Sequence, residues 1–588
     1  MTGRLAPVPN RSQQANVQGG AGVANEPVKA VEQRINPTSN APEDAKTMTT
    51  STGKGGAALV ALATAQFLMV IDQTVMNVSI SQLVLDFDTT VTTIQAVITL
   101  YCLVMAMLIL TGAKIGDMIG RRRAFIIGLI IYACGSLLTA VSQSVAVLAL
   151  GWSVLEGIGA SLVFPALAAL IAGNFEGSRR KAAYAVIGGV AGAGIAVGPI
   201  VGGWATTEYT WRVVFIGEVF IAAFILIMMR HVKDAPAPVP KPKLDVVGSV
   251  LSAAGLGVFV YGVLESSTWG WVEPKDSPIT IFGFPITLFV LAAGCILLWA
   301  FVTWQRHREA TNRDPLVHLS LAKIPPVRAG VIGLFSQNLI LMGTFFVVPL
   351  YLQLVLGLSA FETGIKMLPI SITMLVTAGL GARMSNRFPV RTIVRCGLFV
   401  TIAGVLILLS TIQPTLSSAG FAIGMGVLGV GMGLMISQLG NVIQSSVEES
   451  GRSEAGGLQF TGQQLGSALG VAFIGAIVLT GLTNTFISTI EHDPRISAQI
   501  SSQVGVAAGS NTNFVASSQV EAAATKAGLD QATTTALVSD YEAAQLRALK
   551  AGLLGAALLA GASLAFTREL PHRRPTAGNK LDPAAAAP

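Results

Sequence analysis

Residues 55–85 read GGAALVALATAQFLMVIDQTVMNVSISQLVL, and Asp72 is the single charged side chain among them. A helix needs about 20 mostly apolar residues to cross a bilayer, so this stretch is long enough to span one. A carboxylate at the centre of such a helix costs roughly 2.5 to 3.5 kcal/mol to insert, and such residues usually lie on an ion or proton pathway. Asp72 is therefore the first candidate functional residue, although a hydrogen bond to a neighbouring helix would also account for it.

The composition indicates that the whole chain is a polytopic membrane protein. Of its 588 residues 52% are hydrophobic and 12% charged, whereas soluble domains carry about 25% charged residues. Long stretches nearly free of Asp, Glu, Lys and Arg, separated by polar or Gly/Pro turns, predict fourteen membrane-spanning helices. The predicted spans are 56–82, 92–113, 124–142, 145–173, 182–205, 213–229, 246–264, 280–304, 329–353, 367–382, 396–412, 416–444, 457–482 and 551–567.

The basic residues predict the orientation in the membrane. The 38 Lys and Arg side chains lie mainly in alternate loops, and loops of this kind face the cytoplasm. The short loops on the opposite side hold only Arg212, Lys275 and Lys366. Both termini are therefore expected to be cytoplasmic. The net charge of +7 follows from this topology and from attraction to anionic lipid, so nucleic-acid binding is not expected.

Besides the loops between neighbouring spans, the two tails and one polar segment lie outside the predicted spans. Residues 1–54 are rich in Ala, Pro, Ser, Gly, Asn and Gln, which predicts a disordered cytoplasmic tail. Residues 491–546 are polar and are expected outside, with residues 520–527 and 530–548 as candidate short amphipathic helices. Residues 568–588 form the second cytoplasmic tail.

Two further acids, Glu156 and Glu218, lie at mid-depth of predicted spans, with no Lys or Arg at a similar depth. Uncompensated carboxylates of this kind can take up and release protons, and they attract cations. For Glu218 a hydrogen bond that only packs two helices is an equally good interpretation. No histidine lies within a span and the four cysteines lack metal-ligand spacing, so no metal site is expected.

Residues 72–78, DQTVMNV, resemble the first-helix signature D-x-T-V-x-N-V of the fourteen-helix drug:proton antiporters of the major facilitator superfamily, the EmrB and QacA type. The resemblance extends over about residues 56–567. Residues 113–123, AKIGDMIGRRR, look like the superfamily's loop signature G-x-L-x-D-x-x-G-R-R, with Ala113 in place of the usual glycine. Residues 194–203, GIAVGPIVGG, resemble the antiporter signature G-x-x-x-G-P-x-x-G-G.

The resemblance implies an all-α major facilitator fold with a 6+2+6 arrangement of helices. Residues 55–232 would form the first six-helix bundle, residues 233–327 two inserted helices with their linkers, and residues 328–567 the second bundle, including the outer segment 491–546. The residues expected to act in gating are Asp117, Gly120, Arg121, Arg122, Gly194, Gly198, Pro199, Gly202, Gly203 and Arg212.

The chain also departs from the family pattern. Residues 153–157 read SVLEG where the family has R-x-x-Q-G, and residues 218–220 read EVF where N-V-P is common. These departures indicate a branch whose proton sites lie on acids, with Asp72, Glu156 and Glu218 as the predicted proton-coupling residues. Polar residues expected to line a substrate cavity, each of which could instead be hydrogen-bonded between helices, are Asn77, Gln95, Tyr101, Gln337, Asn338, Gln438, Asn441 and Gln464.

The function expected from these features is proton-coupled export of amphiphilic, cationic drugs or toxic compounds across the cell (plasma or inner) membrane by alternating access. Such a transporter is not an enzyme and needs no cofactor, since the proton gradient drives it. Its partners would be a small amphiphilic substrate, protons and membrane lipid, with a monomer as the working expectation. Export of a neutral metabolite, lipid or siderophore, and a membrane sensor without coupling, stay open as alternatives.

Overall fold

The computed structural model describes residues 44–234, 242–448, 451–510 and 513–572. The chain divides into two units, Met1–Thr50 and Ser51–Pro588, and the architecture below is that of the second. Most of the predicted N-terminal tail and residues 573–588 of the C-terminal tail lie outside the described residues. Helix α1 (Asp44–Val75) begins at Asp44, whereas the first span was predicted to begin at residue 56.

Fourteen helices in the described part of the chain are long and apolar enough to cross a membrane, as predicted. The all-α fold class is thereby confirmed, since the strands among these residues are the two short ones of a single hairpin, β1 (Thr280–Ile281) and β2 (Phe284–Pro285).

The first bundle holds six spans, in which α4 packs against α6 and α8 while α3 packs against α6. One span is a continuous run of three helical segments, the second of which, η2, is a π-helix. The elements are α1, η1 (Met76–Val78), α2 (Ile80–Asp86), α3 (Val91–Ile119), α4 (Arg121–Ala140), α5 (Val145–Leu148), η2 (Ala149–Glu156), α6 (Gly157–Asn174), α7 (Gly177–Glu208), α8 (Arg212–Met228) and η3 (Met229–His231).

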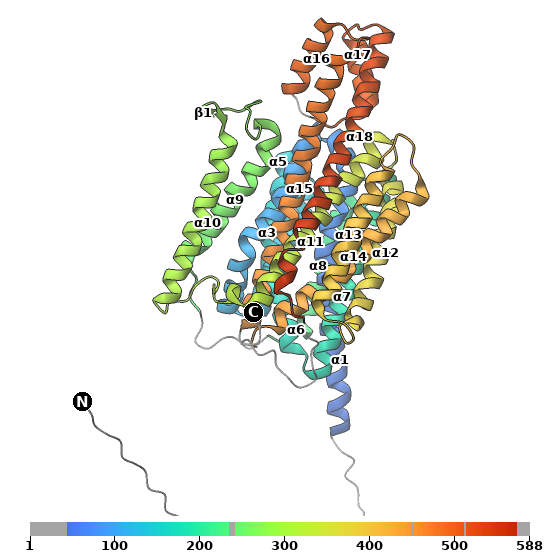
Figure 1. Ribbon diagram of the computed structural model, residues 1–588. Coiled ribbons are helices and arrows are strands. Elements are labelled where there is room, and N and C mark those ends of the chain that lie inside the picture. Colours follow the sequence, from blue (N-terminus) through green and yellow to red (C-terminus); the bar gives the residue numbers. More distant parts are fainter. Residues whose placement is uncertain (1–43, 235–241, 449–450, 511–512, 573–588) are drawn as a thin grey trace, which may run out of the picture. The chain divides into compact units, whose positions relative to one another are not determined.

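Two inserted helices, α9 (Val246–Trp269) and α10 (Ile286–Ala310), lie beside the bundles (Figure 1). Helix α9 packs on α3 and on α15 (Arg452–His492), and α10 packs on α9. Asp245 joins the two inserted helices, because its carboxylate accepts hydrogen bonds from Gly248 N at 3.0 Å, from Trp304 Nε1 at 3.0 Å and from Gln305 Nε2 at 2.8 Å. It therefore caps the start of α9 and holds the end of α10.

The second bundle follows the short helix η4 (Leu321–Lys323) and again holds six spans. Helix α14 packs against α11, α12 and α13, while α15 packs against α11 and α18. The elements are α11 (Pro325–Leu350), η5 (Tyr351–Val355), α12 (Ala360–Met384), α13 (Val390–Thr411), α14 (Ser418–Ser445), α15, α18 (Gln531–Ala562) and η7 (Phe566–Glu569).

Helices α15 and α18 continue beyond the membrane. The 41 residues of α15 extend about 60 Å, twice the roughly 30 Å of the hydrocarbon core. Between them lie α16 (Ala498–Ser510) and α17 (Ser517–Lys526), at the top of Figure 1. The predicted separation of residues 530–548 from the last span, 551–567, was wrong, because α18 is one helix from Gln531 onward. Hydropathy identifies only the apolar part of such a helix.

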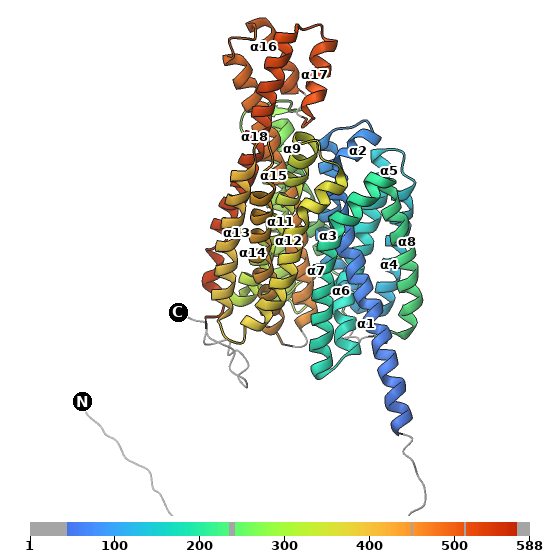
Figure 2. The same ribbon diagram turned by 90° about the vertical axis from the view of Figure 1, so that its right-hand side faces the viewer.

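The two bundles meet along two pairs of helices, α7 with α12 and α3 with α15, and Figure 2 shows the bundles side by side. Along the first pair, a Cβ on Gly364 would collide with the carbonyl of Pro199, and Ser371 Oγ donates to Ile195 O at 3.2 Å. Small residues at such crossings let the backbones approach closely. Near the Val78 end of α1, Gln353 Nε2 donates to Val78 O at 2.9 Å, so the bundles are in contact at this end.

Candidate functional site

The three predicted proton-coupling acids converge inside the first bundle. Asp72 lies on α1, Glu156 at the end of η2 and Glu218 on α8, and one carboxylate oxygen from each lies within 4.8 Å of the others. Asp72 and Glu156 are fully buried and Glu218 is 2% exposed. Residues from three spans that are far apart in the sequence therefore form one buried carboxylate cluster.

Glycines position Glu156 within this cluster. A Cβ on Gly135 of α4 would lie 2.7 Å from Glu156 Cγ and 2.9 Å from its backbone nitrogen. A Cβ on Gly151 of η2 would lie 2.6 Å from Thr139 Oγ1. Both separations are shorter than any side chain tolerates, so η2 lies directly against α4 because these two positions have no side chain.

An aromatic residue, Trp152, holds Asp72 and packs against two further aromatic rings. Trp152 Nε1 donates to Asp72 Oδ1 at 2.8 Å. The Trp152 ring is stacked on Tyr101, with centroids 5.1 Å apart and 13° between the planes, and Phe215 meets its edge at 6.5 Å. Tyr101 was predicted to line a substrate cavity. It is 1% exposed, and its hydroxyl has no hydrogen-bond partner among the described residues.

The other two acids accept hydrogen bonds from α4. Tyr132 Oη donates to Glu218 Oε2 at 2.9 Å and Ser136 Oγ donates to the same oxygen at 3.1 Å. Thr139 Oγ1 donates to Glu156 Oε1 at 3.5 Å. Sequence reasoning missed these donors, because neutral polar residues in a span carry no charge signal. Their spacing of i, i+4 and i+7, which places them on one face of a helix, could have identified them.

One oxygen atom of each carboxylate has no hydrogen-bond partner among the described residues. Asp72 Oδ2, Glu156 Oε2 and Glu218 Oε1 are buried and accept no hydrogen bond among the described residues, and none of the three acids forms an ion pair there. Two unit charges 4.8 Å apart repel by about 3.5 kcal/mol at an effective dielectric constant near 20. The cluster therefore favours binding of positive charge, either protons or a cation with a preference for oxygen ligands.

Two of the predicted cavity residues connect the bundles. Gln95 on α3 is buried and donates to Val471 O on α15 at 2.9 Å. Gln464 on α15 donates to Met105 Sδ on α3 at 3.1 Å. Both therefore make the hydrogen bonds between helices that the sequence left open as an alternative to cavity lining.

The remaining predicted cavity residues are distributed over α11, α14 and η1. Gln337 donates to Met432 O at 3.0 Å and Gln438 to Gly381 O at 2.8 Å, within the second bundle. Asn77 and Asn338 donate to carbonyls four residues earlier in the chain, and Asn441 is exposed. The structure does not bring these residues together with the carboxylate cluster, and a role in substrate binding stays a prediction for each of them.

The predicted gating loop links three helices of the first bundle. Asp117 at the end of α3 forms an ion pair with Arg121 at the start of α4. Gly120 between them has φ of +102°, a conformation that favours glycine. Arg122 Nε donates to Met229 O, just after α8, at 3.1 Å. A latch in this loop would thus act on the ends of α3, α4 and α8 together.

The glycines of residues 194–203 face two helices. Added Cβ atoms at Gly194, Gly198 and Gly202 would lie against α1, and one at Gly203 would collide with the backbone of Ala360 in α12. Helix α7 is thus in close contact both with the helix that carries the first acid and with the second bundle.

Arg212 lies at the other end of α8 from Met229. Its Nη1 pairs with Asp86 Oδ2 at 3.3 Å, its Nη2 donates to Ser142 O at 2.9 Å, and its guanidinium lies 4.3 Å from the centre of a Trp211 ring. Trp211 Nε1 donates to the same Asp86 oxygen at 2.8 Å. This end of the first bundle is therefore cross-linked by one carboxylate.

The architecture and the sequence agree with a known family. Residues 62–471 match the family model of the Major Facilitator Superfamily. Fourteen spans in a 6+2+6 arrangement and a match over most of the chain show that the chain belongs to this superfamily. It is therefore a multi-pass membrane transporter rather than an enzyme, and the family predicted from the signatures is confirmed.

Individual proteins similar to this chain are named as export or resistance proteins, and a solved transporter structure has a similar fold. The chain is 27% identical to the tetracenomycin C resistance and export protein of Streptomyces glaucescens, over 74% of this chain and 78% of that one. It is 30% identical to the puromycin resistance protein of Streptomyces alboniger, over 73% and 83%. In fold it resembles the crystal structure of a bacterial homolog of the human lysosomal transporter Spinster in an inward-facing, unoccupied conformation, with a TM-score of 0.54 at 16% identity over 88% and 98%.

Proposed function

We propose that this protein exports amphiphilic, cationic drugs or toxic compounds in exchange for protons. The observation that supports this most directly is the carboxylate cluster of Asp72, Glu156 and Glu218, buried and without a Lys or Arg partner among the described residues. Such a site binds positive charge because protons or a cation relieve the repulsion between its members. Protons and a cationic substrate can therefore compete for the same negative charge.

The names of relatives support export of a drug-like compound. One similar protein is named for resistance to and export of tetracenomycin C, and another for resistance to puromycin. We propose export for this chain because it belongs to the same superfamily, and we propose a preference for cations because of the carboxylate cluster. A substrate with an apolar body would suit a pathway between apolar helices, and its positive charge would suit the acids.

Alternating access would follow from rocking of the two bundles about the α7–α12 and α3–α15 contacts. Proton binding neutralises the cluster within the first bundle and so changes the packing of α1, η2 and α8. Each proton that moves inward releases roughly 2.3 kcal/mol per 100 mV of membrane potential, in addition to the pH gradient. No cofactor is needed for this cycle, and one chain holds all the parts that it uses.

We further propose that both termini are cytoplasmic and that the protein resides in the cell membrane. The short loops at the Arg212 end carry few basic residues, whereas the Arg121 end carries the basic loops, and cytoplasmic loops retain positive charge. The helical segment of α16 and α17 would then project from the outer face.

Everted membrane vesicles test the proposal. Addition of a cationic substrate should release protons from acidified vesicles that hold the wild-type protein, while Asp72→Asn and Glu218→Gln should reduce this release at least tenfold. Glu265→Gln is the matched control, since it removes a carboxylate from membrane helix α9, outside the cluster. A panel of cationic, neutral and anionic compounds identifies the substrate charge.

Two results would contradict the proposal. Unchanged proton release in the Asp72→Asn variant would exclude coupling through the cluster and favour a sensor. Transport of neutral compounds alone would refute the cationic preference while leaving export intact.

A further inference from the structure

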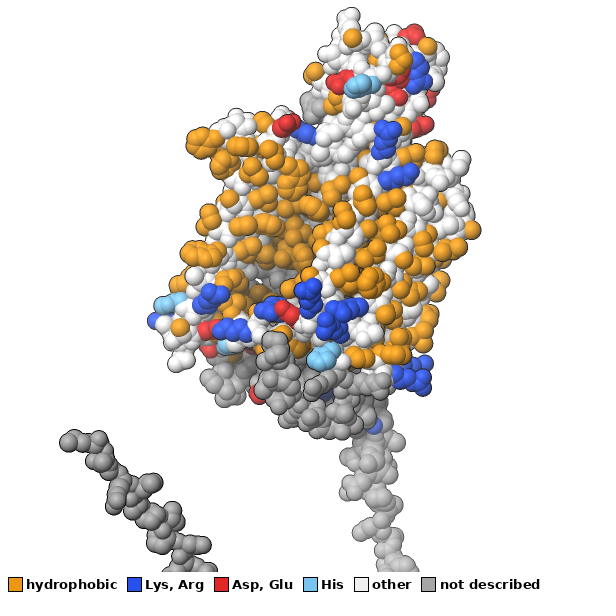
Figure 3. Space-filling view, viewed as in Figure 1, with side chains coloured by type: hydrophobic (Ala, Val, Ile, Leu, Met, Phe, Trp, Pro, Cys, Tyr) orange, Lys and Arg blue, Asp and Glu red, His pale blue; other side chains and the backbone are white. Residues whose placement is uncertain are grey.

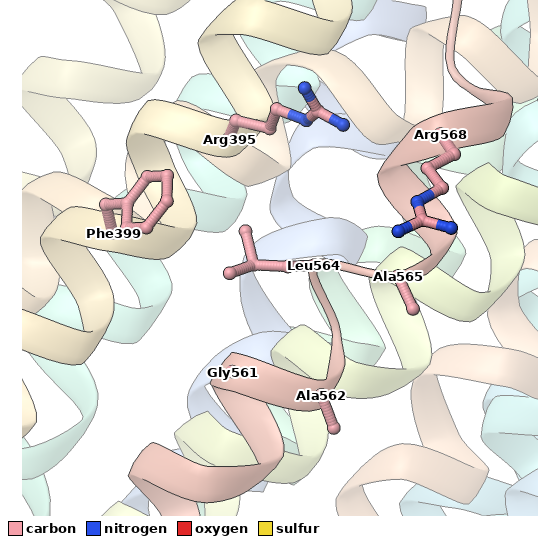
Figure 4. Close-up of a pocket in the computed structure, with 7 residues that line it drawn as sticks. All are labelled: Arg395, Phe399, Gly561, Ala562, Leu564, Ala565 and Arg568. Atoms are coloured by element: carbon pink, nitrogen blue, oxygen red, sulfur yellow. The ribbon is translucent and has the colours of Figure 1, made fainter.

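The start of α13 and the end of α18 lie side by side in the second bundle. A cleft of ≈ 480 Å³ opens there, lined on one side by Arg395 and Phe399 of α13 and on the other by Gly561, Leu564 and Arg568. Figure 4 shows the Arg395 side chain extending from α13 toward the segment that carries Arg568. The cleft belongs to the second bundle and is separate from the carboxylate cluster.

Both arginines have donors available. Arg395 uses Nε to donate to Thr567 Oγ1 at 2.9 Å, which fixes the guanidinium and leaves its two terminal nitrogens without a bond among the described residues. The Arg568 guanidinium forms no hydrogen bond or ion pair within the described part of the chain. The adjacent acid does not neutralise them, because Glu569 is paired with Arg328 through bonds of 2.9 and 2.5 Å.

An apolar surface continues from the cleft along both helices. Phe399 is 59% exposed and Leu406, two turns further along α13, is 47% exposed. On α18, Leu558 is 66% exposed and Leu554 46%, and Gly561 at the cleft has open space where a side chain would be. Figure 3 shows this face, with hydrophobic side chains covering the area next to a belt of Lys and Arg.

The length of this apolar surface matches one leaflet. From Arg395 to Leu406 α13 rises about 16 Å, and half of the hydrocarbon core is about 15 Å. A ligand that fills the whole feature therefore has an anionic head at the arginines and hydrocarbon chains that follow the helices toward the membrane centre.

We propose that this cleft binds an anionic phospholipid, with the headgroup phosphate between Arg395 and Arg568. Guanidinium groups bind phosphate oxygens with paired hydrogen bonds, and basic pockets between membrane helices are suited to anionic headgroups. The acyl chains lie along Phe399 and Leu558. Phosphatidylcholine carries the same phosphate but also a choline cation, so its headgroup has no net charge and two arginines attract it less than they attract a lipid with a net negative charge.

The lipid would join the last span to α13. Helix α18 ends at Ala562, and η7 after it contacts α13, where Arg391 N donates to Pro571 O at 3.3 Å. A phosphate that bonds to one arginine on each side of the cleft adds a further link across this junction, beside the bonds of Arg391 and Arg395. Bound anionic lipid therefore stabilises the folded transporter, which makes binding measurable by thermal unfolding.

Full-length protein in phosphatidylcholine nanodiscs, titrated with phosphatidylglycerol, tests the proposal. We expect the unfolding midpoint to rise with phosphatidylglycerol in the wild-type protein. In the double variant Arg395→Gln with Arg568→Gln, the phosphatidylglycerol concentration that gives half of this rise should be at least tenfold higher. Each basic side chain near a membrane surface contributes about 1 kcal/mol to binding of anionic lipid, and a loss of about 1.4 kcal/mol weakens binding tenfold. The matched control is Arg383→Gln with Arg387→Gln, which removes the same charge from exposed positions at the end of α12.

Equal loss of the lipid response in both double variants would overturn the proposal. It would show that anionic lipid is attracted to the overall positive charge at this end of the second bundle rather than to the cleft. A titration with inorganic phosphate at the same concentration tests whether the cleft binds free phosphate instead of a lipid headgroup. A rise with phosphate alone as large as that with phosphatidylglycerol would show a free-anion site and refute the lipid assignment. The lipid and phosphate titrations of the wild-type protein can refute the lipid assignment even if the double variant fails to fold.

Discussion

Gly198→Ala is a direct test of the close contact between α7 and α1. A methyl group at this position would collide with Thr74 Oγ1 and lie 2.9 Å from Thr74 Cβ, whereas carbon atoms pack at about 3.5 to 4.0 Å. Thr74 is buried, and its hydroxyl is already bonded to Ile71 O at 3.1 Å. Movement of α1 away from α7 would open the neighbouring contacts at Gly194 and Gly202 as well.

The expected cost follows from this overlap. Enlarging a residue in a well-packed interior costs about 1 to 3 kcal/mol, and the better helix propensity of alanine returns up to about 1 kcal/mol. With the full offset, the free energy of unfolding should therefore fall by about 0 to 2 kcal/mol, whereas it should not fall at a position where alanine meets no neighbour. Transport should fall too, since Asp72 lies within a turn of Thr74 on the displaced helix.

Gly189→Ala is the matched control, because a Cβ at Gly189 of the same helix meets nothing within 4 Å. It should leave the unfolding midpoint unchanged or raise it. Thr74→Ala removes the hydroxyl that the new methyl group meets, so adding it to Gly198→Ala should cost less than the sum of the two single changes, by about 0.5 to 3 kcal/mol.

Thermal unfolding of the purified variants and efflux from cells measure these effects. Equal midpoints for Gly198→Ala and Gly189→Ala would refute the packing argument. Strict additivity with Thr74→Ala would show that the cost arises somewhere other than the α1 contact.

Three further predictions concern other parts of the chain. Trp152→Phe keeps an aromatic ring but removes the 2.8 Å hydrogen bond to Asp72, so coupled export in vesicles should fall at least tenfold, since such a bond contributes about 1.5 to 3 kcal/mol; an unchanged rate would remove Trp152 from the site. Asp245→Ala removes the cap of α9 and should lower the free energy of unfolding by about 2 kcal/mol, which an unchanged unfolding midpoint would contradict. The hydrogen bond with Glu454 raises the pKa of His318. Protonated His318 therefore stabilises the folded protein fully below the ordinary histidine pKa near 6.5, and this stabilisation is lost as pH rises through the raised pKa. Unfolding midpoints measured between about pH 5 and about pH 9 should show this loss in the wild-type protein and not in Glu454→Gln.

Hydropathy predicted the spans well, because a bilayer imposes one length and one composition on every helix that crosses it. It failed where a helix leaves the membrane. Residues 530–548 were predicted as a separate short amphipathic helix, yet α18 continues from Gln531 into the span without a break. Packing against α15 and α17 outside the membrane determines its conformation, and a single-sequence pattern does not contain those contacts.

The acids of the site could be predicted from the sequence, but their arrangement could not. Asp72, Glu156 and Glu218 were identified because each is a lone charge in a span. Their convergence to within 4.8 Å depends on how α1, η2 and α8 are rotated against α4. Depth in the membrane can be read from position along a span, whereas rotation about the helix axis depends on packing between neighbouring helices.

Glu156 illustrates this dependence on packing. It ends a π-helix, Ala149–Glu156, in which the wider turn changes the direction of every later side chain relative to an α-helix. A 3.6-residue period extended through this segment would therefore place Glu156 at the wrong angle. The wide turn lies against α4 through Gly135 and Gly151, and any larger side chain at either position would push the carboxylate out of the cluster. The residues that determine where this acid lies are thus two glycines, which no search for charged or polar groups would select.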